Sequence, residues 1–157
     1  MILTIDFETR SECDLKTAGV WKYAEHPSTR ILCLGIKVDG FPANLWWPEW
    51  TGQEGISLST LADLLKEARY IYAHNAEFET AMWGLMPIPL PLEKVRCTAA
   101  MAAYHALPRS LDACAKALGL SAGKDAEGYK LMMRMCKPQK DRKTGEKFWI
   151  EDSASLQ

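Results

Sequence analysis

The chain begins with a short apolar run that is followed by acidic residues. This run constrains the first element of the fold to be a buried strand. Met1 to Asp6 reads Met-Ile-Leu-Thr-Ile-Asp, which predicts a short buried strand that ends in carboxylates. A second apolar run, Arg30–Val38, is followed by Asp39-Gly40, a strong signal for a hairpin turn. Pro42–Trp47 then predicts a third strand, so we expect an antiparallel meander at the start of the chain.

The rest of the chain alternates between helical and extended patterns. Leucines recur at helical spacing over Ser57–Arg69, which predicts an amphipathic helix. The mixed segment 9–27 indicates a loop with one helical turn, and residues from Lys137 onward indicate a basic loop or extended hairpin. These patterns together predict an α/β domain with a mixed sheet flanked by helices. The other predicted elements are strands over Tyr70–Ala73 and Val95–Thr98, and helices from Asn75 or Ala76 to Leu85, over Ala99–Ala106, Ser110–Leu118 and Asp125–Cys136.

Charge and cysteine content narrow the class of protein. The chain has 19 Lys and Arg against 20 Asp and Glu, which excludes a protein that binds nucleic acid mainly as a polycation. An enzyme that acts on nucleic acid through a small acidic site remains possible. None of the five cysteines forms a Cys-x-x-Cys pair, and no apolar run approaches the roughly 18 residues that span a bilayer. We therefore expect reduced thiols in a soluble, cytoplasmic protein with no membrane partner.

Two acidic motifs are the strongest functional candidates. Asp6 and Glu8 stand two residues apart in a strand, so their side chains project from the same face. Two such charges repel unless a cation binds between them; the plainer interpretation is that both acids are solvated. In the second motif, Asn75 is placed to cap a helix that carries Phe78 and Glu79 in its first turn. Each of these residues also has an ordinary structural interpretation, as cap, core residue and favourable first-turn charge.

Taken in order, the two motifs resemble those of the DnaQ-like (DEDD) 3′–5′ exonucleases. The similarity is closest to the proofreading domain of family A DNA polymerases of the phage type, and it implies a ribonuclease H-like fold. The motifs are Asp-x-Glu at the first strand and Asn-x-x-Phe-Glu about 70 residues later. The stretches that carry the resemblance are 3–9, 18–27, 73–79, 96–98, 107–111, 117–120 and 136–138.

The resemblance implies two-metal-ion cleavage with Mg²⁺ or Mn²⁺. Asp6 would bridge both metals, and Glu8 would bind one of them and orient the attacking water. Glu79 stands where the family commonly has Asp, and would ligate the other metal directly or through water. The implied partners are a single-stranded DNA 3′ end and a polymerase, which is either a downstream domain or a separate subunit. The implied location is the cytoplasm, which for a phage protein is that of the host. The implied substrate-binding residues are Phe7, Thr9, His74, Asn75 and Phe78, with the Phe7 ring as a stacking surface.

One motif of the family is missing. No Tyr is followed by Asp four residues later, and no His by Asp five residues later. The nearest match places Phe148 before Asp152, and Phe cannot hydrogen-bond a water, so Asp152 is a weak candidate for the fourth acid. We therefore expect an exonuclease-like domain over 1–136, followed over 137–157 by a basic loop and the start of a C-terminal element that is cut short.

Several alternatives stay open at this stage. The chain could be a catalytically incomplete fragment that only binds a DNA 3′ end or a polymerase, or an exonuclease of the same fold that trims RNA. His74 could contact substrate or serve the structure. The basic residues of the tail could hold a DNA backbone or line a solvated loop. These residues are Lys137, Lys140, Arg142, Lys143 and Lys147.

Overall fold

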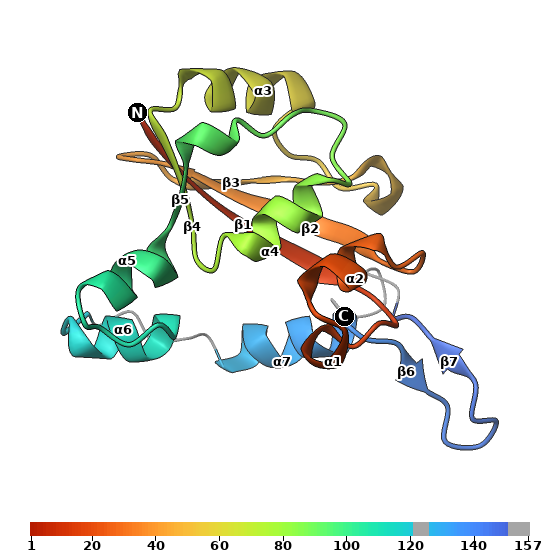
Figure 1. Ribbon diagram of the computed structural model, residues 1–157. Helices are drawn as coiled ribbons and strands as arrows, with labels where there is room; N and C mark the ends of the chain where they lie inside the picture. Colours follow the sequence, from red (N-terminus) through yellow and green to blue (C-terminus); the bar gives the residue numbers. More distant parts are fainter. Residues whose placement is uncertain (121–125, 151–157) are drawn as a thin grey trace.

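A computed structural model describes residues 1–120 and 126–150, and its centre is a five-stranded sheet (Figure 1). The strand order is β3-β2-β1-β4-β5. β1 pairs with β2 antiparallel and with β4 parallel, and β5 joins β4 in parallel. The predicted α/β class with a mixed sheet is confirmed. The strands are β1 (Ile2–Arg10), β2 (Arg30–Val38), β3 (Ala43–Trp46), β4 (Tyr70–Ala73) and β5 (Val95–Cys97).

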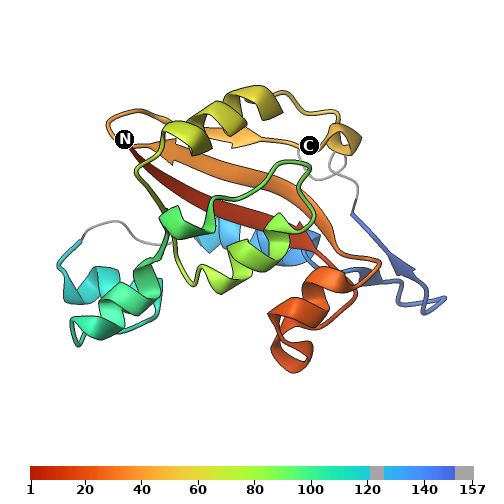
Figure 2. The same cartoon turned by 45° about the horizontal axis from the view of Figure 1, so that its top comes forward.

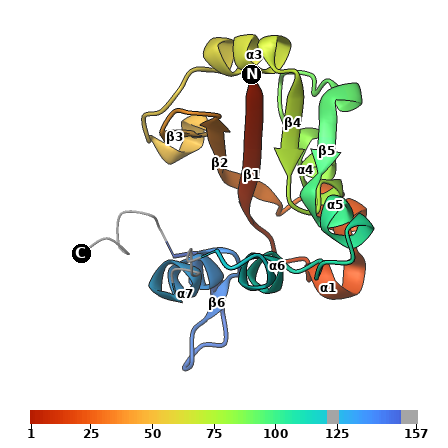
Figure 3. The same ribbon diagram turned by 90° about the vertical axis from the view of Figure 1, so that its left-hand side faces the viewer.

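Short helices connect and cover the strands. The longest, α3 and α7, have ten residues each, and no helix in the described ranges is long and apolar enough to cross a membrane. Figures 2 and 3 show α4 and α7 on opposite sides of β1. The helices are α1 (Leu15–Ala18), α2 (Val20–Glu25), α3 (Leu58–Glu67), α4 (Glu77–Trp83), α5 (Thr98–Tyr104), α6 (Leu111–Ala117) and α7 (Ala126–Met135), with 3₁₀ turns η1 (Glu49–Thr51) and η2 (Leu92–Lys94).

The core lies between one face of the sheet and helices α3 and α4. Along β1 the side chains alternate, so that Leu3, Ile5 and Phe7 are buried while the residues between them face outward. α3 adds Leu61 and Leu65 from its apolar side. Met82 and Trp83 of α4 complete the same cluster. One face of β1 therefore packs in the core, and the opposite face carries polar side chains.

Several predicted elements are confirmed at or near their predicted bounds. β2 and β4 match their predicted residues, and Gly40 takes φ 81° in the turn after β2, as a hairpin turn requires. The Ser57 hydroxyl caps α3 by accepting a hydrogen bond from the Thr60 N–H at 3.0 Å. The predicted basic hairpin forms as β6 (Gln139–Lys140) paired with β7 (Lys147–Phe148).

The start of the chain differs from the prediction. The first strand does not end at Asp6 but continues to Arg10, because β2 pairs with it over that whole length. The segment predicted as a loop over 9–27 holds two short helices, α1 and α2. Asp14 caps α1 by accepting from the Lys16 and Thr17 N–H groups, and Gly19 at φ 80° separates the two helices.

Candidate active site

The two carboxylates of β1 lie beyond the point where its parallel partner stops. β4 pairs with β1 only over Ile2–Thr4, whereas β2 pairs with it as far as Arg10. Asp6 and Glu8 follow the end of the β4 pairing, on the face opposite the buried core side chains. A strand edge without a neighbour presents free backbone groups. The acids therefore stand beside an edge that another group can approach.

That approaching group is Glu79 of α4. Its side chain is only 2% exposed, and its Oε2 is buried without a hydrogen-bond partner among the described residues. Burial is the main cause that raises the pKa of Glu79 to about 7, and the charge of Asp6 adds to it. Hydrogen bonds from the backbone N–H groups of Glu79 itself and of Phe7 act in the opposite direction. Glu79 thus reaches the unpaired edge of β1 and lies within the field of Asp6.

The charge of Asp6 disfavours the charged forms of both Glu8 and Glu79. Burial, and then the charge of Asp6, raises the pKa of Glu8 to about 7. Burial also raises the pKa of Asp6, partly offset by His74. No three His, Cys, Asp or Glu side chains in the described part of the chain converge closely enough to form a ready metal group. Asp6 instead interacts with each Glu, and the orphaned Oε2 and the oxygen-only donors suit a hard divalent cation.

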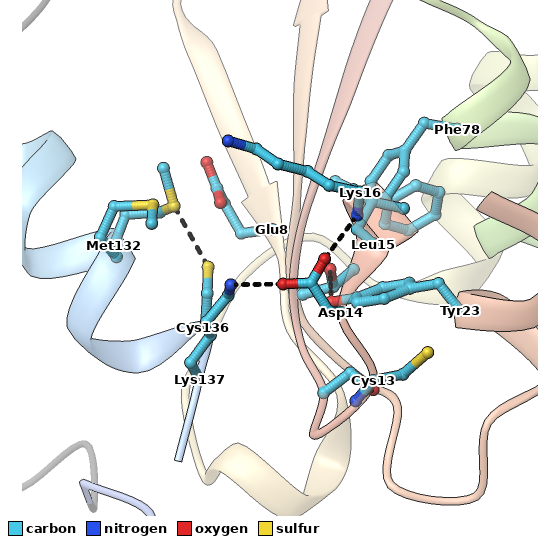
Figure 4. Close-up of a pocket in the computed structure, with 14 residues that line it drawn as sticks. Glu8, Cys13, Asp14, Leu15, Lys16, Tyr23, Phe78, Met132, Cys136 and Lys137 are labelled. Atoms are coloured by element: carbon cyan, nitrogen blue, oxygen red, sulfur yellow. Dashed lines mark hydrogen bonds and ion pairs between the residues drawn. The ribbon is translucent and has the colours of Figure 1, made fainter. Parts of the chain in front are cut away.

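A cavity of about 260 Å³ opens next to Glu8. Figure 4 shows Glu8 between Met132 of α7 on one side and Lys16 of α1 on the other. Tyr23 and Phe78 form an apolar wall, with ring centroids 6.2 Å apart. The Tyr23 hydroxyl is fixed by a 2.9 Å hydrogen bond with the Thr9 hydroxyl. The cavity can therefore hold an aromatic group against apolar walls, with a carboxylate at one side.

The C-terminal end of α7 closes this cavity. The Ser11 N–H donates to the Cys136 carbonyl at 3.1 Å, which ties α7 to the segment after β1. An ion pair of 3.1 Å between Lys137 and Asp14 lies beside it. Burial, and then the charge of Glu8, raises the pKa of Cys136 to about 11. Cys136 therefore remains a neutral thiol near neutral pH and acts as part of the wall.

Two of the predicted substrate-binding residues make contacts within the protein itself. The Phe7 ring is 4% exposed and packs edge-to-face on Trp83 with ring centroids 5.5 Å apart, but Phe7 also lines the cavity, so its stacking role stays a prediction. His74 uses both ring nitrogens, Nδ1 with the Thr98 hydroxyl at 3.0 Å and Nε2 with the Arg109 carbonyl at 2.9 Å. The structural interpretation of His74 is therefore the better one.

Asn75 is also not the helix cap that its position suggests. It takes φ 64°, and its side chain makes no capping hydrogen bond, while Ala76 occupies the N-cap position of α4. Asn tolerates this left-handed conformation, which the tight turn between β4 and α4 requires. Its carbonyl accepts a hydrogen bond from the Phe78 N–H at 2.9 Å. Asn75 thus turns the chain so that Glu79 faces β1.

Other candidates have mixed outcomes. Thr9 and Phe78 both line the cavity, and their contact with substrate stays a prediction. Asp152, the weak fourth acid, lies outside the described residues. The cavity wall supplied by Tyr23 and Met132 was not predicted as part of a site. The amphipathic pattern of α7 indicated a buried side, but no local signal tells which surface that side covers.

The fold and the site define an α/β protein with a cluster of carboxylates beside an apolar cavity. A DNA polymerase of Bacillus phage SP02 is 36% identical to the chain over 145 residues, which cover 88% of this chain. The matched region makes up 22% of that polymerase, so the chain spans about a fifth of the length of this relative. No protein-family profile matches the sequence. The chain is therefore related to part of a phage DNA polymerase, as the resemblance implied.

Proposed function

We propose that this chain is a 3′–5′ exonuclease domain that removes 5′-mononucleotides from single-stranded DNA 3′ ends, as in proofreading. The observation that carries the proposal is the buried Oε2 of Glu79, which lies within the field of Asp6 and has no hydrogen-bond partner in the described part of the chain. The strand order is compatible with a ribonuclease H-like fold. The similarity to a phage DNA polymerase supports a context in which a DNA 3′ end is the substrate.

Asp6, Glu8 and Glu79 would hold two divalent cations, Mg²⁺ or Mn²⁺, with Glu79 acting directly or through a water. When bound, such cations stabilise the attacking and leaving oxygens of phosphodiester hydrolysis. Their positive charge would also favour the ionised forms of the three carboxyls, whose pKa values are raised in the protein alone. The cost of burying Glu79 unpaired is thus offset when the site is loaded.

The other residues of the site would bind and orient the substrate. Glu8 holds the attacking water at its carboxylate oxygen, at the rim of the cavity. The apolar walls formed by Tyr23, Phe78 and Met132 receive the terminal base and exclude bulk water. Because Thr9 fixes the hydroxyl of Tyr23, this wall is rigid before substrate binds. The backbone around Phe7 and Thr9 would lie along the terminal nucleotide.

The test is nucleotide release from a labelled single strand in Mg²⁺ or Mn²⁺. The double variant Asp6→Ala, Glu8→Ala is expected to lose at least about 100-fold in rate, because both groups act on developing charge. The matched control is Asp63→Ala, Glu67→Ala, which removes the same two residue types from the exposed side of α3. Equal rates for wild type and the Asp6, Glu8 variant contradict the proposal.

A second candidate is a domain that binds a DNA 3′ end without cleaving it. It is favoured by the lack of a ready three-member metal group in the residues that the structure describes. Binding of a single strand without nucleotide release in either metal supports this second candidate. A matched RNA strand in the same assay separates DNA-trimming from RNA-trimming activity.

A further inference from the structure

The hairpin of β6 and β7 is a basic arm beside the candidate site. We define the arm as residues 137–148, which hold five Lys or Arg against two acids in a chain whose net charge is −1. Figure 1 shows the two strands extending away from the sheet and its helices. Its residues from Lys140 to Phe148 are all exposed. The cations are Lys137, Lys140, Arg142, Lys143 and Lys147.

The tip of the arm is built so that its cations stay free. Asp141, one of the two acids, accepts hydrogen bonds from the backbone N–H groups of Lys143 at 2.6 Å and Thr144 at 2.9 Å. These bonds, that from Thr144 first, hold the pKa of Asp141 below its usual value. The turn closes through Gly145 at φ 75°, whose N–H donates to the Asp141 carbonyl. Asp141 therefore shapes the turn through its backbone contacts.

The cations at the tip have no acidic partner within the described ranges. The ion pairs found there involve Lys137 and Lys147, at the base of the arm, and Lys116 of α6. Lys140, Arg142 and Lys143 are exposed and enter none of them. Three neighbouring unpaired cations repel one another, and an anionic partner removes that cost. The tip is thus a local positive surface on a nearly neutral protein.

The base of the arm is fixed to the segment that directly follows the carboxylate strand. Lys137 pairs with Asp14 at 3.1 Å, and Lys147 lies 3.5 Å from Glu12. The backbone bond from Ser11 to Cys136 adds a third link. Lys137 also lines the cavity that contains Glu8, as Figure 4 shows. The arm therefore begins at the candidate site, and its positive tip lies further out.

We propose that the basic arm binds the phosphates of the single strand whose 3′ end enters the site, an inference that rests on the proposed function. An extended stretch of six residues spans roughly 20 Å, and every nucleotide of a single strand carries one phosphate charge. The arm therefore covers several phosphates upstream of the terminal nucleotide. Arg142 offers a planar fork for bidentate contact with a phosphate. Lys140 and Lys143 flank it as point charges.

The experiment measures binding rather than cleavage. The full chain, in EDTA, is titrated against a labelled 12-nucleotide single strand at several salt concentrations. The arm variant is Lys140→Gln, Arg142→Gln, Lys143→Gln, and the control is Lys22→Gln, Lys66→Gln, Lys116→Gln, which neutralises three exposed lysines outside the arm. The arm variant is expected to bind about tenfold or more weakly, with the slope of log K against log salt reduced by about 2. The control keeps the wild-type affinity and slope.

Equal affinity and slope for the arm variant and wild type overturn the inference, even when wild type releases nucleotides. Loss of affinity in the arm variant supports it, even when wild type releases none, so the two proposals fail separately. A three-nucleotide strand is too short to reach the tip and should bind both proteins equally. Displacement of the 12-mer by polyglutamate as readily as by unlabelled DNA assigns the arm to an acidic protein and overturns the proposal.

Discussion

The two halves of β1 belong to one strand but have different neighbours. Ile2–Thr4 is flanked by β2 on one side and β4 on the other. From Asp6 to Arg10 the strand keeps β2, but its pairing with β4 has ended. At that edge lies the carboxyl of Glu79 in place of a neighbouring strand, and the Phe7 N–H acts to lower its pKa.

This difference in strand pairing explains the location of the candidate site. In the first half, every edge of the strand is used by the sheet, and buried side chains such as Leu3 stabilise the protein. In the second half, Glu79 of α4 lies at this edge, and its Oε2 has no hydrogen-bond partner among the described residues. A buried carboxylate without a full set of partners costs free energy. The candidate site therefore lies where the pairing of β1 with β4 ends.

The largest expected effect on stability belongs to the core face of β1. Ile5→Ala removes a side chain that is 1% exposed, and we expect a loss of about 3 kcal/mol in the free energy of unfolding. The control is Thr4→Ala, which changes the exposed neighbour on the opposite face and should stay within about 0.5 kcal/mol. Urea unfolding measures both. Similar losses in the two variants would show that the faces of β1 are not distinct.

A change of opposite sign is expected at Glu79. Glu79→Gln at pH 8 in EDTA removes a buried charge and should raise the free energy of unfolding by about 1–2 kcal/mol. The same variant should lose nucleotide release in Mg²⁺, because the proposed ligand is gone. Glu67→Gln, on the exposed side of α3, is the matched control and should change neither quantity. A destabilised Glu79→Gln protein is incompatible with an unpaired carboxylate at this position.

The pH dependence of stability follows from the same carboxyls. The pKa values of Glu8 and Glu79 rise from 4.5 to about 7 in the folded protein, so the folded state keeps protons that the unfolded state releases. Their contribution is therefore fully present below about pH 4.5 and is lost as pH rises through about 7. Urea midpoints of the metal-free protein from pH 5 to 8 measure it. The double variant Glu8→Gln, Glu79→Gln should show a smaller fall; an identical fall would assign the dependence to other groups.

The smallest expected effect on the free energy of unfolding is at the turn between β4 and α4. Because Asn75 is left-handed at φ 64°, Asn75→Gly should keep the stability within about 0.5 kcal/mol, and Asn75→Ser should lose about 1 kcal/mol. A side-chain cap predicts the reverse order, since Ser is a good N-cap. Thermal unfolding of the two variants decides between these roles. Retained stability in Asn75→Ser would restore the capping interpretation.

The sequence predicted those parts of the fold that depend on local patterns. β2 and β4 lie where their apolar runs lie, and the turn after β2 follows from Asp39-Gly40. The end of β1 was misjudged because the length of β2, not the chemistry at Asp6, sets it. The helices α1 and α2 were missed because four to six residues carry too little periodicity to separate a helix from a loop.

For the candidate site too, the sequence predicted local features but not contacts between distant segments. The two-residue spacing of Asp6 and Glu8 predicted their common face without any structure. The same alternation places Phe7 on the opposite face, with Leu3 and Ile5, but its contact with Trp83 depends on how α4 packs against the sheet. The position of α7 near Tyr23 could not be predicted, because contacts between segments more than a hundred residues apart leave no local sequence signal.

By itself, then, the sequence determined which groups are available: acids two residues apart on one strand, an acid in the first turn of a helix, and a basic arm. The tertiary structure alone decided that Glu79 is buried at the unpaired edge of β1, 2% exposed and with one oxygen unsatisfied. The physical reason is that burial and neighbouring charge, which set the pKa of a carboxyl, arise from segments that only the folded chain brings together.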